Sequence, residues 1–231
     1  MNIIIPARGG SKRIPDKNKK LFHGVPIIQK VIENLRSIPE ISRIIISTDD
    51  PEIESIAKNA GAEIPFIRPK NLSDDHTDTI SVVKHALQHL DLNKSEIIGC
   101  VYSTSVFLNR DLIRRVDKTV GFNPEVFTFF AKEFEHPIQR AFTMNDNSQI
   151  VLNDLDHSNN RTQDYELFFH DAGQIYAAYC SVWQKEDRII KNGSIALLDE
   201  RIITVDIDQE RDWKFAELIL DLNKTGSSQD E

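Results

Sequence analysis

The feature that most constrains the fold is a regular alternation of short apolar runs with longer segments of helical periodicity. Residues 3–5, 41–47 and 97–102 are apolar runs of strand length, and residues 63–67 form a further short extended segment. Between them, apolar side chains recur at helical spacing over residues 27–35, 53–57, 82–90 and 112–120. This alternation predicts an α/β fold, with a largely parallel sheet in a three-layer arrangement.

The loop after the first strand concentrates positive charge in a chain whose net charge is −8. It contains Arg8, Gly9, Gly10, Ser11, Lys12, Arg13 and Lys17. Glycines let the backbone approach a ligand closely and adopt positive φ, and cations with free N–H groups suit a polyphosphate. We therefore expect a nucleoside-triphosphate site. The alternative is a solvated basic turn, because neither the G-x-x-x-x-G-K-[ST] motif nor G-x-G-x-x-G is present.

Polar residues also follow the other predicted strands of the first half. Thr48-Asp49, Arg68 and Ser103-Thr104 come directly after apolar runs. In a parallel sheet the carboxyl ends of the strands meet at one edge, where ligands bind. The sequence therefore predicts one pocket at that edge, shared with the basic loop.

A pair of carboxylates, Asp206 and Asp208, stands at the end of an expected strand over residues 202–207 and before the last helix. Alternation along a strand places both on one side, with Ile207 on the other. Two carboxylates facing phosphate oxygens form a hard oxygen site for Mg²⁺. The alternative is that Asp208 caps the helix while Asp206 is solvated.

The remaining polar clusters carry weaker signals. His170 and Asp171 are adjacent on an expected strand, so they point to opposite faces and should not form a dyad. His85 and His89 are four apart on a helix, which without a third ligand favours a solvated face over a metal site.

Composition excludes several classes of function. The negative net charge argues against general binding to nucleic acid or membrane surfaces. No apolar run has the length of a signal peptide or a transmembrane helix. Cys100 and Cys180 lie in apolar stretches typical of buried free thiols. A reduced, cytoplasmic protein is the expectation.

The second half departs from the alternation. Residues 126–131, 136–144 and 150–152 look extended, residues 145–148 form a turn, and residues 153–164 are polar. We interpret this as an arm inserted into a single domain of residues 1–231, and arms of this kind favour a homodimer. Residues 174–179 are predicted as a strand and 181–186 as a short helix. A last helix precedes a mobile tail at residues 225–231.

Assembled, these motifs resemble the CMP-sugar-acid synthetases, the cytidylyltransferases that activate sialic acid and its relatives. The resemblance covers nearly the whole chain. It lies in Ile-Pro-Ala-Arg-Gly-Gly-Ser-Lys-Arg-Ile-Pro at residues 5–15, Lys17-Asn18, Ser47-Thr48-Asp49, Arg68-Pro69 and Asp206-Ile207-Asp208 with Asp212-Trp213. Residues 136–141, 161–164 and 169–176 are most similar to the branch that activates pseudaminic acid.

This resemblance implies a fold of the nucleotide-diphosphosugar transferase type, with a mixed, mostly parallel sheet and a dimerisation arm near residues 132–165. It implies a nucleotidyltransferase that joins CTP and a nonulosonic acid into a CMP-sugar and pyrophosphate, with Mg²⁺ as cofactor. The implied nucleotide-binding residues are Ala7, Arg8, Gly9, Gly10, Ser11, Lys12, Arg13, Lys17, Asn18, Arg68 and Thr79. The implied sugar-acid residues are Tyr102, Gln139, Arg140, Arg161, His170 and Gln174, some reaching across a dimer.

Lys12, Asp206 and Asp208 would act in catalysis, with both aspartates also holding the metal. The expected chemistry is in-line attack of the sugar's anomeric hydroxyl on the α-phosphate, with the general base left open between Asp206 and water held by the metal. The competing hypotheses are a synthetase of the same class for sialic, legionaminic or 3-deoxy-octulosonic acid, an NDP-sugar transferase, and a nucleotide-binding regulator without turnover.

Two positions depart from the family pattern. Asp78 stands where a small residue is usual and would bring negative charge near the nucleotide, or accept a ribose hydroxyl. Val106 replaces a common proline, which leaves the shape of that loop open.

Overall fold

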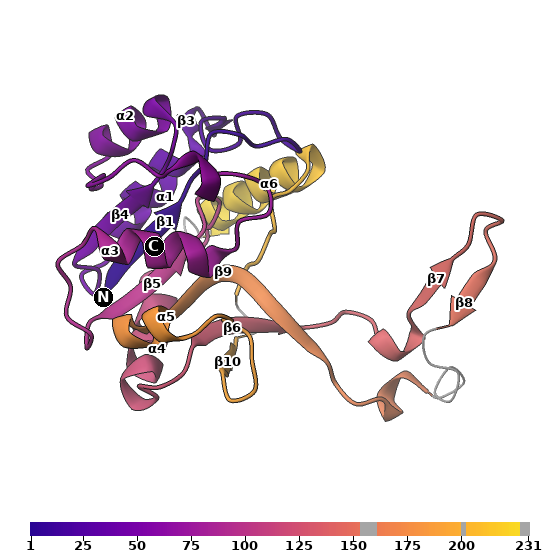
Figure 1. The fold of residues 1–231 in the computed structure, drawn as a ribbon. Coiled ribbons are helices and arrows are strands. Elements are labelled where there is room, and N and C mark those ends of the chain that lie inside the picture. The colour runs from indigo at the N-terminus through magenta and orange to yellow at the C-terminus, as the bar shows by residue number, and fades with distance from the viewer. Residues whose placement is uncertain (153–160, 200–201, 227–231) are drawn as a thin grey trace.

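The computed structural model describes residues 1–152, 161–199 and 202–226 (Figure 1). These residues form a six-stranded sheet in the order β10-β6-β9-β5-β1-β4. Its strands are β1 (Asn2–Pro6), β4 (Arg43–Ser47), β5 (Ile97–Val101), β6 (Thr128–Glu133), β9 (Phe169–Tyr179) and β10 (Ile195–Leu198). Strand β9 is antiparallel to β5 and β6, and the other pairs are parallel, which confirms the mixed, mostly parallel sheet.

Helices cover both faces of this sheet. They are α1 (Ile27–Arg36), α2 (Pro51–Asn59), α3 (Thr79–Gln88), α4 (Arg110–Phe122), α5 (Cys180–Lys185) and α6 (Glu210–Gly226). One core cluster joins α1, α2, α4 and α6 to Ile3 and Ile5, and a second joins α3 and α5 to Ile4. Adjacent side chains of β1 thus enter opposite cores, as the two-residue period of a strand requires. The predicted three-layer arrangement is confirmed.

Short elements complete the chain. Strands β2 (Leu21–Phe22) and β3 (Val25–Pro26) form a small hairpin, and β7 (Phe142–Met144) pairs with β8 (Ile150–Leu152). Short 3-10 turns cover Lys70–Leu72, Ile138–Arg140 and Thr162–Asp164. The β7–β8 hairpin projects from the body on extensions of the chain after β6 and before β9 (Figure 1).

Four sequence predictions about the elements are wrong in type or extent. Residues 202–207 are not a strand. The late strand is β10, because it is residues 195–198 that return beside β6 and pair parallel with it. Residues 136–144 are extended only over β7, since Ile138–Arg140 forms a 3-10 turn. Of residues 63–67, Glu63 alone forms a ladder bridge, to Ile45. Helix α6 also runs to Gly226, into the predicted tail, and residues 227–231 lie outside the described range.

Cys100 and Cys180 are buried free thiols, as predicted. Within the described residues, no helix combines the length and apolar character that crossing a bilayer requires.

Asp78 has a structural role that the sequence motifs did not predict. It is the N-cap of α3, and its carboxylate accepts hydrogen bonds from the backbone N–H and the hydroxyl of Ser81, both at 2.8 Å. An N-cap oxygen satisfies a helix N–H that has no partner within the helix. This cap accounts for an acidic residue at the start of α3 without any contact to a ribose hydroxyl.

We therefore predict that Asp78→Ala lowers the free energy of unfolding by about 1 kcal/mol, while Asp78→Ser, which retains a capping oxygen, stays within a few tenths of a kcal/mol of wild type. Urea denaturation at pH 7 measures both. Partial burial opposes the shift, but the hydrogen bonds from Ser81 lower the pKa of Asp78 below its ordinary 3.8. The stability that wild type has over Asp78→Ala is therefore fully present above the ordinary pKa of 3.8, and it is lost as the pH falls through the lowered pKa. Equal stability of Asp78→Ala and wild type would contradict the cap.

Candidate active site

The basic loop begins where β1 leaves the sheet. The N–H of Ala7 still donates to the carbonyl of Ser47 on β4, at 2.9 Å, and the chain then turns away. Asn18, which is buried, fastens the end of the loop. Its side-chain amide donates to the carbonyl of Arg8 at 2.8 Å, and its Oδ1 accepts from the Ser103 hydroxyl at 2.5 Å. The basic loop is therefore fixed to the ends of both neighbouring strands, β4 and β5.

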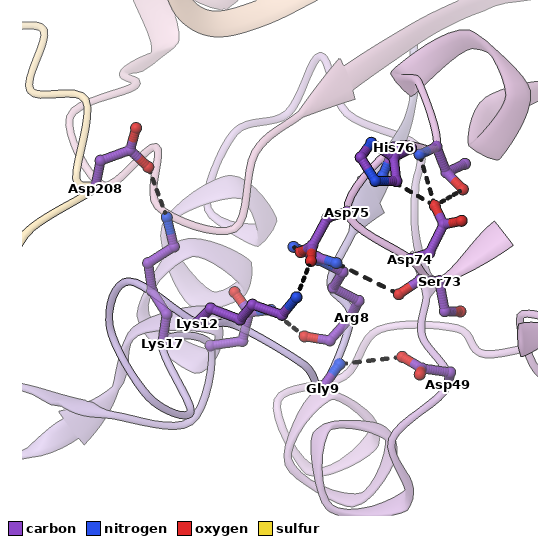
Figure 2. Close-up of polar contacts among 12 residues, drawn as sticks. Arg8, Gly9, Lys12, Lys17, Asp49, Ser73, Asp74, Asp75, His76 and Asp208 are labelled. Atoms are coloured by element: carbon purple, nitrogen blue, oxygen red, sulfur yellow. Dashed lines mark hydrogen bonds and ion pairs between the residues drawn. The ribbon is translucent and has the colours of Figure 1, made fainter.

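The two glycines of the loop serve different purposes. The N–H of Gly9 donates to Oδ1 of Asp49 at 3.0 Å (Figure 2), and a Cβ at Gly9 would meet Oδ2 of Asp50 at 2.6 Å. A Cβ at Gly10 would meet nothing within 4 Å. Neither glycine has positive φ, so the loop does not use the conformational freedom that they allow. Close packing on the cap of α2 is what requires glycine, and it does so at position 9.

The cations of the loop are paired with carboxylates from distant segments (Figure 2). Arg8 and Lys12 both contact Asp75, each at 2.5 Å. Arg13 and Lys17 both contact Asp208, at 2.7 and 3.3 Å, and Lys17 also donates to the carbonyl of Ile207 at 2.7 Å. The loop is thereby joined to the segment before α3 on one side and to the segment before α6 on the other.

Arg68 is buried, with 4% of its surface exposed, and its Nε and Nη2 have no hydrogen-bond partner among the described residues. Burial lowers the pKa of its guanidinium, and the carboxylate of Asp49 opposes that shift. Unused donors on a buried charge are costly unless something accepts from them. Arg68 therefore indicates a ligand with acceptor atoms at this position.

These residues line one cleft of about 530 Å³, which we call the basic cleft. Of the predicted nucleotide set it includes Arg8, Ser11, Lys12, Arg13, Lys17, Asn18, Arg68 and Thr79. Ala7 is buried and Gly9 and Gly10 belong to the backbone of the loop beside it. Tyr102 and Ser103 come from the end of β5, so the loop, Arg68 and Ser103 converge as predicted. Thr48, Asp49 and Thr104, which were predicted to share this pocket, do not line it. Asp74, Asp75 and Thr77 also line the basic cleft; sequence reasoning missed them, and only the length of the polar loop before α3 hinted at them.

The carboxylate pair lies beside the basic cleft on an irregular segment. Ile207 is fully buried, whereas Asp206 and Asp208 are not, so the predicted alternation holds although the segment is not a strand. Reduced hydration, and then repulsion from Asp208, raise the pKa of Asp206. A carboxylate beside a second one, with its charge disfavoured, suits a divalent cation. No third carboxylate, histidine or cysteine completes a metal site within the described residues, so phosphate oxygens and water would have to supply the other ligands.

A second cleft of about 630 Å³ adjoins Asp206. Its walls are residues 132–136 at the end of β6, residues 170–173 at the start of β9, Thr204 and Asp206. We call it the arm-base cleft, because the chain of the arm leaves the body here. Asp206 lines this cleft, and Asp208 contacts two cations of the basic cleft, so the carboxylate pair separates the two.

A bulge in β9 shapes the arm-base cleft. Asp171 is opposite Ala131 and Tyr176 is opposite Phe129, so on the β6 side residues 172–175 have only Phe130 opposite them. Gly173 has φ +62°, which a residue with a side chain rarely adopts. The Tyr176 hydroxyl donates to the Asp171 carboxylate across the bulge, and the His170 ring donates to the Asp171 carbonyl. The Asp171 carboxylate thus bonds Tyr176, while His170 bonds the Asp171 backbone, although both residues line the arm-base cleft.

The predicted sugar-acid residues fall in two places. Tyr102 lines the basic cleft, where its hydroxyl is 3.1 Å from Oγ1 of Thr79; His170 lines the arm-base cleft; and Gln174 is buried in the bulge. Gln139, Arg140 and Arg161 lie on the arm and line neither cleft. Of the six residues, therefore, only Tyr102 and His170 line a cleft.

The profile of the Cytidylyltransferase family matches residues 2–216. This chain belongs to the cytidylyltransferase family. Pseudaminic acid cytidylyltransferase of Campylobacter jejuni subsp. jejuni serotype O:2 is 40% identical over 222 residues, which are 95% of this chain and 96% of that protein. CMP-N,N'-diacetyllegionaminic acid synthase of Legionella pneumophila is 28% identical over 96% of each chain. The resemblance in the motifs is therefore confirmed for the family.

The fold of this cytidylyltransferase is also found in solved structures. CMP:2-keto-3-deoxy-manno-octonic acid synthetase complexed with CTP superposes with a TM-score of 0.70, covering 96% of this chain and 98% of that chain at 15% identity. At that identity the likeness shows the shared architecture alone.

The close approach of Gly9 to Asp50 can be tested by adding a methyl group at position 9. Gly9→Ala should lower the free energy of unfolding by about 1–3 kcal/mol, because the added methyl group displaces Asp50 from the cap of α2. Gly10→Ala is the matched control and should be within about 0.5 kcal/mol of wild type, since its methyl group meets nothing. Urea titrations measure both. A Gly10→Ala variant as unstable as Gly9→Ala would show that the glycines are needed for another reason.

Proposed function

We propose that this cytidylyltransferase joins CTP to pseudaminic acid and releases pyrophosphate. The observation that carries the proposal is the basic cleft, in which a buried arginine with unused donors lies beside four cations of one loop. The choice of sugar acid follows the 40% identical Campylobacter jejuni protein, whose name specifies pseudaminic acid.

The cleft suits CTP in both charge and hydrogen bonding. Arg8, Lys12, Arg13 and Lys17 would contact the triphosphate, for which charge-assisted N–H···O bonds are strong ligands. Arg68 and Thr79 would contact the cytidine, whose carbonyl and ring nitrogen accept hydrogen bonds from the unused donors of Arg68. Removing a buried donor that bonds to a charged or strongly polar acceptor costs about 1.5–3 kcal/mol of binding free energy.

Asp206 and Asp208 would hold Mg²⁺ between the two clefts. When bound there, Mg²⁺ neutralises phosphate charge and lowers the pKa of a hydroxyl that it contacts. Lys12, Arg13 and Lys17 would offset the charge that develops on the departing pyrophosphate, at about 3–4 kcal/mol for a well-placed donor. The proton of the attacking anomeric hydroxyl would pass to Asp206 or to water held by the metal.

The arm supports a homodimer in which each chain completes the site of the other. Exposed apolar side chains gather on the arm and its base: Phe134, Phe142, Met144, Ile150, Val151, Leu167, Phe168 and Phe169. Strands β7 and β8 pair only with each other within the described residues, so neither face of the hairpin is covered. An apolar surface of this kind is typical of an interface between chains. It would carry Gln139, Arg140 and Arg161 towards a partner's sugar-acid site.

The proposed reaction predicts pyrophosphate release from CTP and Mg²⁺ with pseudaminic acid, and none with sialic acid or without an acid. Asp208→Asn should reduce kcat at least about a hundredfold, because it removes a negative ligand from the metal site. A coupled pyrophosphate assay measures both. Release with sialic or legionaminic acid instead would keep the reaction and change the substrate. If CTP binds but no acid leads to pyrophosphate release, a nucleotide-binding regulator would be favoured.

The dimer predicts rescue between two inactive variants. Arg161→Ala removes an arm residue and Asp208→Asn removes a body residue, so a mixed dimer has one intact site. After subunit exchange in an equal mixture, about one quarter of wild-type activity should return. Light scattering checks that each variant alone has the mass of a dimer. An inactive mixture of dimeric variants would show that the arm acts within its own chain.

A further inference from the structure

Asp75 bridges two cations of the basic loop with one carboxylate. Its Oδ1 is 2.5 Å from Nη2 of Arg8, and its Oδ2 is 2.5 Å from Nζ of Lys12 (Figure 2). Arg8 also approaches the carbonyl of Ser73, at 3.5 Å. The segment before α3 therefore supplies an anion to the same two side chains that would contact a nucleotide's phosphates.

The two acidic residues of this segment have different tasks. Asp74 accepts hydrogen bonds from the N–H groups of His76 and Thr77 and from the Thr77 hydroxyl, at 2.7–3.0 Å, so its carboxylate holds the turn together. Asp75 accepts none of these bonds and faces the basic loop across the cleft. Its side chain is 34% exposed, which leaves it room to move aside.

The charge of Asp75 is present at all physiological pH values. Hydrogen bonds from Lys12 and Arg8 lower the pKa of its carboxyl to about 2. A carboxylate and a phosphate present similar oxygen acceptors to a guanidinium or an ammonium group. Arg8 and Lys12 cannot give the same N–H donors to both at once, so any polyphosphate in the basic cleft must compete with Asp75.

We propose that Asp75 is an internal competitor for the phosphate-binding cations, and that it weakens polyphosphate binding and so favours release of pyrophosphate. This inference rests on the proposed function, since it takes the basic cleft as the phosphate site. The pairs are partly exposed, with 80% of the Lys12 side chain accessible to solvent, so each contributes little stability and can exchange readily. A triphosphate has charge enough to displace one carboxylate, whereas the uncharged cytidine does not engage these cations.

The test is isothermal titration of the full-length protein with inorganic pyrophosphate, in buffer free of divalent cations so that only the chain's own cations contribute. Asp75→Asn preserves the size of the side chain and removes its charge. We expect it to bind pyrophosphate about five- to tenfold more tightly than wild type. Cytidine, as the matched ligand without phosphate, should bind both proteins equally.

Two control variants separate charge from loop structure. Asp75→Glu keeps the charge and should bind pyrophosphate within about twofold of wild type. Asp74→Asn weakens the turn but leaves Asp75 ionised, and it should not bind pyrophosphate more tightly. Thermal unfolding verifies that all the variants are folded.

The outcomes distinguish this inference from the proposed function. If wild type binds pyrophosphate and Asp75→Asn binds it equally or less tightly, Asp75 orients the cations instead, and the inference alone is overturned. If neither protein binds pyrophosphate, the loop cations do not hold a phosphate group by themselves, and the inference is overturned. The pyrophosphate-release assay with Mg²⁺ tests the proposed function separately.

Discussion

The rest of the structure depends on the burial of β1 in the middle of the parallel part of the sheet. Ile3, Ile4 and Ile5 are fully buried between two helical layers, and β1 pairs with both β4 and β5. Parallel pairing brings the carboxyl ends of all three strands to one edge. The basic loop, Thr48-Asp49 and Tyr102-Ser103 therefore meet there, although they are far apart in the sequence.

Charge compensation organises that edge. The loop after β1 brings together four cations, Arg8, Lys12, Arg13 and Lys17. Asp75 forms ion pairs with two of them on one side, and Asp208 with the other two on the other side. Each carboxylate comes from a segment just before a helix, α3 or α6, so helix packing sets its position. Under the proposed function, these four cations would contact a polyphosphate by exchanging partners, whereas Arg68 already has unused donors. The affinity would then depend on the internal carboxylates as well as on the cations.

The antiparallel strand β9 lies between β5, whose end borders the basic cleft, and β6, after which the chain leaves for the arm. Its bulge opposite Phe130 turns Asp171 and Gly173 into the arm-base cleft, while Tyr176 ties the bulge together. Bulges redirect side chains where an uninterrupted ladder would fix them. The same strand continues outward into the arm, so one element connects the site with the exposed apolar surface of the hairpin.

The sequence by itself determined the features that depend on local pattern. Helical and strand periods predicted the layers, and the signature residues of the basic loop and of Asp206–Asp208 predicted the family and the principal edge of the site. It could not predict β10 or the bulge, because strand pairing is decided by which distant segment returns beside β6, not by residues 195–198 alone. The same limit applies to Asp78. It could be identified as an N-cap only when the structure showed that α3 begins at the next residue.

The tertiary structure alone decided the partners of the charges. Nothing local in residues 74–75 distinguishes the carboxylate that closes a turn from the one that reaches Arg8 and Lys12. Likewise, Arg68 follows a short extended segment in the sequence, and only the packed structure shows that it is buried with unused donors. Long-range ion pairs and burial are properties of the folded chain, because they join residues that the sequence separates by tens of positions.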